Sequence, residues 1–139
     1  MFANSVPSYA DNDLIGTDAT SADDNFDQSH PLFQAIRGLA NLHGQYEALR
    51  SGAMILRYGS DVPGVFAFSR IDRDERVEYV VALNNGETSD SATVPTYSPG
   101  GVKYKLLTDT KAPNKLATAS DGSLSLTVPP LGFVVYAKK

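Results

Sequence analysis

Carboxylates are the side chains of this sequence that come closest to a catalytic pattern. Asp23 and Asp24 are adjacent in a polar segment, and Asp72, Asp74 and Glu75 stand together in a charged tip between two apolar runs. Two carboxyl groups held a fixed distance apart can act as general acid and as base or nucleophile. The first pair lies in an irregular segment, and charged tips keep hairpins soluble. We therefore expect both groups to be solvated turns, and we predict no catalytic residue.

Nucleophilic catalysis needs a base beside the nucleophile, and His30 and His43 are the two imidazoles of the sequence. His30 precedes Pro31 at an expected helix start, and His43 lies on or beside an apolar stripe. A capping or packing role is therefore expected for each. The chain has no cysteine, which removes thiol nucleophiles, thiolate metal sites and disulfides. It also has no phosphate-binding loop, dinucleotide fingerprint or metalloprotease motif.

One segment resembles the opening of a calcium-binding loop. It is the run DND at 11–13, followed by Gly16. The fifth loop position is Ile15, however, and the twelfth, where a bidentate Glu is needed, is Ala22. We predict no metal or cofactor for this chain, with an irregular calcium site on some of these aspartates as the alternative.

Exposed aromatic rings are the remaining candidates, because such rings can stack on sugars. The chain has no Trp, and its strand aromatics alternate as core or sheet packing requires. Tyr97 differs, since it lies beside a turn rich in Pro and Gly. We take Tyr97 as a candidate substrate-binding residue.

The distribution of charge argues against a nucleic-acid partner. Residues 1–29 carry six Asp and no Lys or Arg, whereas residues 30–139 hold ten acids and twelve bases, and neither part has a dense basic stripe. No apolar run approaches the roughly 18 residues that a membrane span needs. We predict neither nucleic acid nor a membrane as partner. The sequence does not determine a location, and a piece of a secreted or periplasmic protein is compatible with it.

Periodicity divides the chain into an irregular segment and a helix, followed by strands. Residues 1–28 show no period and are rich in turn-forming Ser, Asp, Asn and Thr. Apolar residues then recur at three- and four-residue spacing, which predicts a helix over about residues 30–50. We expect Ser29 as its N-cap and Gly52 in the left-handed conformation after its last turn.

From residue 51 onward the pattern is that of strands. Val65, Ala67 and Ser69 alternate with Phe66, Phe68 and Arg70, as in a half-buried hairpin strand. Turn signals separate seven runs, at residues 53–59, 64–71, 76–85, 91–98, 102–109, 123–129 and 132–138. The predicted fold class is mainly β: an antiparallel, Greek-key-like β-sandwich of about seven or eight strands, preceded by one α-helix.

The order of these pieces is itself recognisable. The Asp-rich segment DLIGTDATSADDNFD leads into the helix, Glu47–Gly52 follow the pattern "h.aLr.G" with h apolar, and the hairpin residues Phe66–Arg70 and Val80–Asn84 precede a terminal motif at Leu126–Val135. Over nearly its whole length the chain resembles the C-terminal end of α-amylase-family glycoside hydrolases (family 13). The resemblance implies that residues 1–50 are a remnant of the catalytic (β/α)8 barrel, with an irregular loop at 1–28 and its last helix at about 30–50. Residues 51–139 would be the all-β C-terminal domain.

The same resemblance implies a non-catalytic chain. The nucleophile, the acid/base residue and the transition-state-stabilising Asp of the family lie on barrel strands that precede this sequence. The resemblance implies a structural accessory role beside the missing barrel of an enzyme acting on α-glucans, with the apolar helix face on the barrel. Calcium in that parent enzyme is left open. Residues 1–28 resemble a segment that can border the substrate cleft, so Tyr9 is a second candidate substrate-binding residue.

Two other classes of function remain open. A carbohydrate-binding module would have a sugar site of its own, and an adhesion or interaction sandwich would be unrelated to sugars. The exposed helix face also makes self-association an expectation for the isolated chain.

Overall fold

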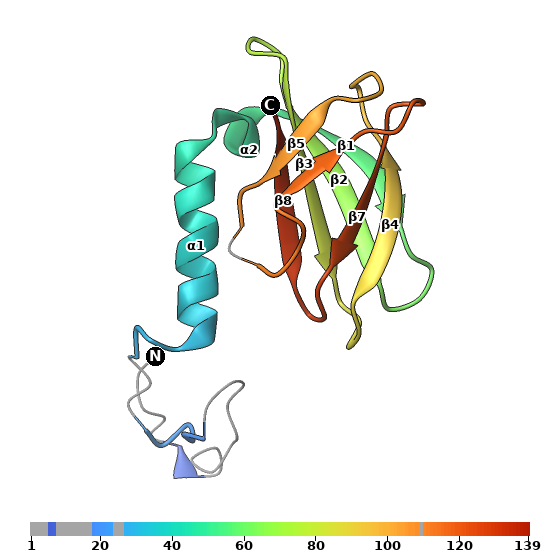
Figure 1. The fold of residues 1–139 in the computed structure, drawn as a ribbon. Coiled ribbons are helices and arrows are strands. Elements are labelled where there is room, and N and C mark those ends of the chain that lie inside the picture. Colours follow the sequence, from blue (N-terminus) through green and yellow to red (C-terminus); the bar gives the residue numbers. More distant parts are fainter. Residues whose placement is uncertain (1–5, 8–17, 24–26, 109) are drawn as a thin grey trace. The chain divides into compact units, whose positions relative to one another are not determined.

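The structure, a computed structural model, describes residues 6–7, 18–23, 27–108 and 110–139. The chain forms two compact units, Met1–Asn41 and Leu42–Lys139. Helix α1, Pro31–Gln45, begins in the first unit and ends in the second, and all strands of the sandwich belong to the second (Figure 1). Within the described ranges, no helix is long and apolar enough to cross a membrane.

The start of α1 differs from the prediction. His30, not Ser29, caps the helix: its Nδ1 accepts the backbone N–H of Leu32 at 3.1 Å, and its carbonyl accepts that of Gln34 at 3.0 Å. The Ser29 hydroxyl instead donates to the carboxylate of Asp27 at 2.7 Å. That bond lowers the pKa of Asp27 and leaves the capping role to the next residue.

The predicted single helix over about 30–50 is two helices, α1 and the short α2, Glu47–Ser51. Tyr46 separates them with an extended backbone (φ −114°, ψ 113°), and its ring packs on Tyr79 with the centroids 5.3 Å apart. The contact between Tyr46 and Tyr79 therefore accompanies a break between the two helices. The break lies close to Gly44, whose low helix propensity already weakens this part of the helix. The guanidinium of Arg50 donates to the carbonyls of His43 and Gly44, 2.8 and 2.6 Å away, which stabilises the end of α1.

Gly52 follows α2, but it is not left-handed as predicted. Its φ is −60° and its ψ 153°. A Cβ at this position would lie 2.5 Å from the carbonyl oxygen of Ala48 and 2.8 Å from that of Ile71. Glycine is required here because two backbones approach closely, and not because of the sign of φ.

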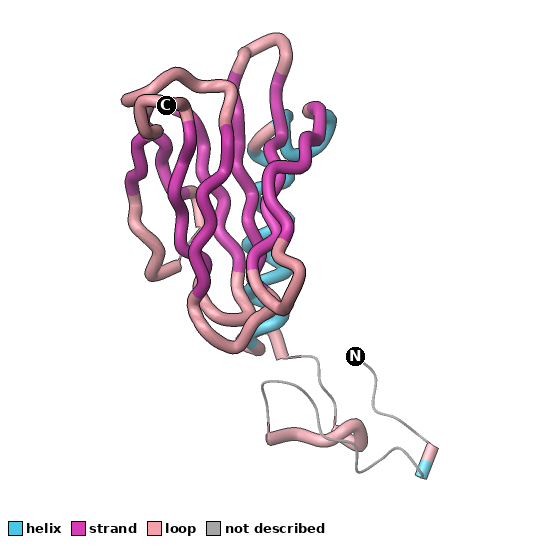
Figure 2. The backbone as a smooth tube through the Cα atoms, turned by 90° about the vertical axis from the view of Figure 1, so that its right-hand side faces the viewer, coloured by secondary structure: helices cyan, strands magenta, loops and turns pink. Residues whose placement is uncertain are grey.

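Within the described residues, eight strands form two antiparallel sheets. Figure 2 shows these strands in magenta. The larger has the order β1-β2-β3-β8-β5-β6, and the smaller pairs β4 with β7. The bounds are β1 Ala53–Gly59, β2 Val65–Asp72, β3 Val77–Asn84, β4 Asp90–Pro95, β5 Lys103–Leu106, β6 Lys115–Ala117, β7 Ser123–Val128 and β8 Phe133–Lys138. The predicted mainly-β antiparallel sandwich is confirmed, and β6 is the strand that the seven predicted runs did not include.

The core lies between the two sheets. Along β2, Val65, Ala67 and Ser69 are at most 1% exposed, whereas Phe66, Phe68 and Arg70 lie on the other face. The smaller sheet contributes the buried apolar side chains Ala92, Val94, Leu124, Leu126 and Val128. The predicted alternation of β2 is therefore confirmed, with its small residues pointing inward.

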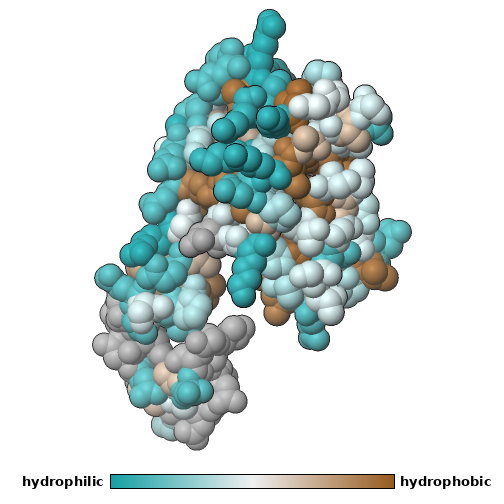
Figure 3. Space-filling model, viewed as in Figure 1, coloured by the Kyte–Doolittle hydropathy of each residue, from teal (hydrophilic) through white to brown (hydrophobic). Residues whose placement is uncertain are grey.

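The outer face of the larger sheet is apolar and partly exposed. Cross-strand pairing places Leu56 of β1 opposite Phe68 of β2, and Phe66 of β2 opposite Leu83 of β3. Leu56 is 63% exposed, and Phe66 and Leu83 are each 42% exposed. By contrast, polar residues predominate on the face seen in Figure 3, where hydrophobic residues show between them over the strands.

Candidate functional site

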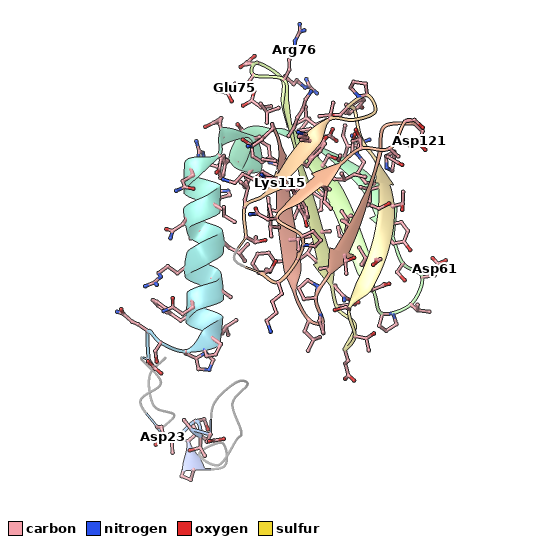
Figure 4. All side chains as sticks on the ribbon, viewed as in Figure 1. Asp23, Asp61, Glu75, Arg76, Lys115 and Asp121 are labelled. Carbon is pink, nitrogen blue, oxygen red and sulfur yellow. The ribbon has the colours of Figure 1, made fainter. Side chains whose placement is uncertain are left out.

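The acidic hairpin tip between β2 and β3 forms a turn. One carboxylate oxygen of Asp72 accepts the backbone N–H groups of Asp74 and Glu75 at 2.9 and 3.0 Å. Asp74, Glu75 and Arg76 are exposed, and Figure 4 shows the labelled Glu75 and Arg76 extending from the tip of the hairpin. These carboxylates form a solvated turn, as predicted, and do not face one another across a cleft.

The other acidic candidates are only partly within the described residues. Asp23 accepts the backbone N–H of Thr20 at 2.8 Å in a local turn, and Asp24 lies outside the described residues. The calcium-like run at 11–13, Gly16 and the candidate Tyr9 lie outside them as well. Among the residues that are described, no three His, Cys, Asp or Glu side chains gather closely enough to hold a metal ion.

Among the described residues, the hydrogen bonds at the two histidines join them to backbone groups or to Arg50, and not to a nucleophile or a carboxylate. His30 serves as the cap of α1 described above. His43 is exposed in the last turn of the same helix, and its carbonyl accepts a hydrogen bond from Arg50. The side chain of His43 is exposed in this chain, so the packing role expected for it stays a prediction.

A buried polar ladder crosses three adjacent strands of the larger sheet. Arg57 of β1 donates through Nε to the hydroxyl of Ser69 on β2 and through a terminal nitrogen to Oε1 of Glu78 on β3, both at 2.8 Å. Ser69 donates to the same Oε1 at 2.6 Å. The side chains of Arg57 and Glu78 are 9% and 3% exposed. Buried charges of this kind require both a counter-ion and hydrogen bonds, and the ladder supplies them.

The second oxygen of Glu78 organises the loop between β4 and β5. Its Oε2 accepts the backbone N–H of Tyr97 at 2.9 Å and the phenol of Tyr104 at 3.0 Å. The Tyr104 phenol is also 3.0 Å from the hydroxyl of buried Ser98. Burial raises the pKa of Tyr104, so the phenol stays protonated and can donate. Both oxygens of Glu78 therefore accept hydrogen bonds, and this carboxylate ties β1 and β2 to the β4–β5 loop.

Tyr97 is the sequence-predicted candidate that the structure presents at the surface. It is 67% exposed, and the guanidinium carbon of Arg57 lies 4.6 Å from its ring centroid. Its backbone is tied to Glu78, as described above. Sequence reasoning identified Tyr97 but missed Arg57 and Glu78. The sequence could have indicated Glu78. In β3 it lies two residues from Val80 and therefore on the same, inward face, where an acid needs a partner.

A groove of about 480 Å³ lies beside Tyr97 at one end of the sandwich. Its apolar lining comes from β1 and β2 and comprises Ala53, Ile55 and Ile71. Its polar lining includes Asp72, Arg73, Arg76 and Lys138, together with Ser98 and Glu78. Two ion pairs occur within the described ranges, Arg50–Glu47 and Arg57–Glu78, so the cations that line the groove take part in neither.

The chain matches a known family over its strands. Residues 60–139 match the model of the α-amylase C-terminal all-β domain. The chain therefore belongs to the family of α-amylase C-terminal all-β domains.

Relatives of known sequence agree with this assignment. An α-amylase of Streptomyces lividans is 40% identical over 97% of this chain, and a cyclomaltodextrinase of Geobacillus thermopakistaniensis is 26% identical over 79% of it. This chain spans 14% and 18% of the lengths of those two proteins.

Solved structures share the fold. An Anoxybacillus α-amylase matches with a TM-score of 0.66 at 20% identity, covering 87% of this chain and 25% of that one. A debranching enzyme of Nostoc punctiforme matches with a TM-score of 0.60 at 23% identity, covering 84% of this chain and 25% of that one. These similarities show the architecture of the sandwich.

Proposed function

We propose that this chain is the non-catalytic C-terminal part of an α-amylase-like glycoside hydrolase acting on α-glucans, and that its role there is structural. On this proposal residues 1–50 complete the catalytic barrel and residues 51–139 form the supporting sandwich. The family match and the small share of each relative that the chain spans both support this division.

The observation that carries the structural role is the apolar outer face of the larger sheet. Leu56, Phe66 and Leu83 are between 42% and 63% exposed there, and Met54 on the same face is 55% exposed. Burying such side chains stabilises an interface by about 25 cal/mol per Å² of apolar area. The occupant we propose for this face is the catalytic domain of the same polypeptide, because that is the part of the relatives that this chain does not span.

The exposed side of α1 provides a second apolar surface for the barrel. Leu32, Phe33, Ile36 and Leu39 are 41–58% exposed although they recur at helical spacing. An amphipathic helix normally buries such a stripe. In the parent enzyme we propose that it packs on the barrel to which the helix belongs.

Two measurements test the proposal. The isolated chain, incubated with soluble starch, should release no reducing sugar, whereas the parent enzyme should release it readily. Removing residues 53–139 from the parent should lower its melting temperature. Sugar release by the isolated chain, or an unchanged melting temperature after truncation, would contradict the proposal.

A further inference from the structure

Tyr97 combines high exposure with a fixed backbone. Its N–H is held by buried Glu78. The preceding Thr96 donates its hydroxyl to the carbonyl of Gly122 at 2.8 Å and accepts the N–H of Ser98 at 3.0 Å. Hydrogen bonds on both sides of Tyr97 therefore restrain the loop before any ligand arrives. A ring held in this way loses little freedom on binding, which lowers the entropic cost of complex formation.

The contact with Arg57 determines which face of the Tyr97 ring is open to a ligand. The guanidinium lies 4.6 Å from the ring centroid and is itself fixed by Ser69 and Glu78. A cation held over one face of an aromatic ring leaves the opposite face for a flat apolar ligand surface. The C–H face of a pyranose ring is such a surface, and it stacks on tyrosine.

The groove beside the ring supplies the polar groups that a sugar requires. Its volume of about 480 Å³ lies within the range of small-ligand sites, about 300–1,000 Å³. Arg73, Arg76 and Lys138 line it as hydrogen-bond donors, and Asp72 lines it as an acceptor. The two hydrogen bonds described for Asp72 both use Oδ1, and its Oδ2 can accept from a ligand hydroxyl. Apolar Ile55 and Ile71 complete a lining of mixed character.

We propose that Tyr97 and this groove form a saccharide-binding site, in which a pyranose ring stacks on Tyr97 and its hydroxyls reach the polar lining. The choice of an α-linked glucan among saccharides rests on the proposed parent enzyme. The site itself does not depend on the structural role, because the exposed apolar residues Leu56, Phe66 and Leu83 of the outer face do not line the groove. It would hold a glucan chain on the accessory domain without any catalytic step.

The test is a titration of the isolated chain with maltoheptaose, followed by the backbone amide signals in NMR spectra. We expect shifts at Tyr97, Ser98 and Arg73, and about tenfold or greater weakening in Tyr97→Ala. Tyr97→Phe should keep the affinity, because the stacking face is retained. Tyr58→Ala is the matched control: Tyr58 is 36% exposed, stands near the other end of β1 and does not line the groove.

Each other outcome counts against the proposal. No shift at millimolar maltoheptaose, or equal affinity in Tyr97→Ala, would overturn the site. Equal binding of cellohexaose would overturn the assignment to an α-glucan, and displacement of the sugar by inorganic phosphate would identify an anion site instead. Leu56→Asp, which alters the outer face of the sheet, should leave the titration unchanged. Failure of this site is thereby separated from failure of the structural role.

Discussion

Arg57 and Glu78 form an ion pair of 2.8 Å across the buried face of a sheet, with the strand that carries Ser69 between them. The pair joins the first and third strands of the sandwich to the loop that carries Tyr97. Stability and the geometry of the surface site therefore depend on the same carboxylate.

Arg57→Ala should destabilise the chain by about 3–5 kcal/mol, because it leaves the carboxylate of Glu78 buried without its counter-ion. Urea unfolding followed by circular dichroism measures the change. The double variant Arg57→Met/Glu78→Gln should lose less free energy of unfolding than Arg57→Met and Glu78→Gln lose together as single variants. The reason is that the double variant leaves no unpaired buried charge. If Arg57→Ala lowered the free energy of unfolding by less than about 1 kcal/mol, the ion pair would contribute no more to stability than an exposed pair does.

Asn84 connects the β3–β4 loop to the end of β7 and the loop that follows it, and this contact gives a second prediction. Its amide nitrogen is 2.8 Å from the carbonyl of Thr88 and 3.3 and 3.2 Å from those of Val128 and Pro129, and its oxygen accepts the N–H of Gly86 at 2.8 Å. Asn84→Asp keeps the shape but brings a carboxylate against these carbonyls. We expect a loss of at least about 2 kcal/mol in urea unfolding.

The control for that variant is Asn114→Asp, because Asn114 is exposed. Its effect should stay within about 0.5 kcal/mol. Equal unfolding midpoints for the two variants would mean that the amide of Asn84 does not hold the loops.

Tyr136 makes stability dependent on pH in the alkaline range. It is fully buried, its phenol donates to the carbonyl of Pro113 at 2.7 Å, and burial raises its pKa from 10.0 to about 12. The unfolded chain ionises this phenol near pH 10 and the folded chain near pH 12, so the unfolded state loses its proton first. Stability is therefore full below pH 10 and falls by roughly 2–3 kcal/mol as the pH rises to about 12.

Unfolding midpoints measured from pH 8 to pH 12, at roughly unit steps, check this window. Tyr136→Phe should be slightly less stable at neutral pH, by about 1 kcal/mol for the lost hydrogen bond, and its stability should fall less steeply above pH 10. A variant with the same alkaline slope as the wild type would exclude Tyr136 as the titrating group.

The exposed stripe of α1 predicts association of the isolated chain. Ile36 is 58% exposed at the centre of this stripe. Light scattering across a dilution series should show a mass above that of the monomer at high concentration, and Ile36→Glu should return the chain to a monomer. Gln34→Glu, on an exposed neighbouring position, is the control with the same added charge. A wild-type monomer at all concentrations would contradict the expectation.

Sequence periodicity predicted the sandwich because one face of each strand must be buried. The alternation of Val65 and Ala67 with Phe66 and Phe68 indicated two faces of β2, and the structure shows that the face with the small residues lies inward. Strand β6 escaped prediction because three residues are too few to show a period. The break at Tyr46 could not be read locally, since it depends on a contact with Tyr79 that is distant in sequence.

The candidate site was predictable only in part. The Pro- and Gly-rich neighbourhood of Tyr97 indicated an exposed ring, and the structure places it at the surface. Its support by Arg57 and Glu78 arises from the register of three strands, which no local pattern reveals. The groove is lined by residues of β1, the β2–β3 hairpin, the β4–β5 loop and the end of β8. These segments are distant in the sequence and come together only in the folded sandwich.

The most direct test of the structural role compares Leu56→Asp in the isolated chain and in the parent enzyme, with Val62→Asp as control. Both side chains are exposed here, 63% and 70%, but Leu56 lies on the outer face of the larger sheet and Val62 in a loop. We expect both variants to change the stability of the isolated chain by less than about 1 kcal/mol. In the parent, Leu56→Asp should lower the melting temperature by several degrees, because a carboxylate is buried against the catalytic domain, and Val62→Asp should not. An unchanged melting temperature for Leu56→Asp in the parent would contradict the account.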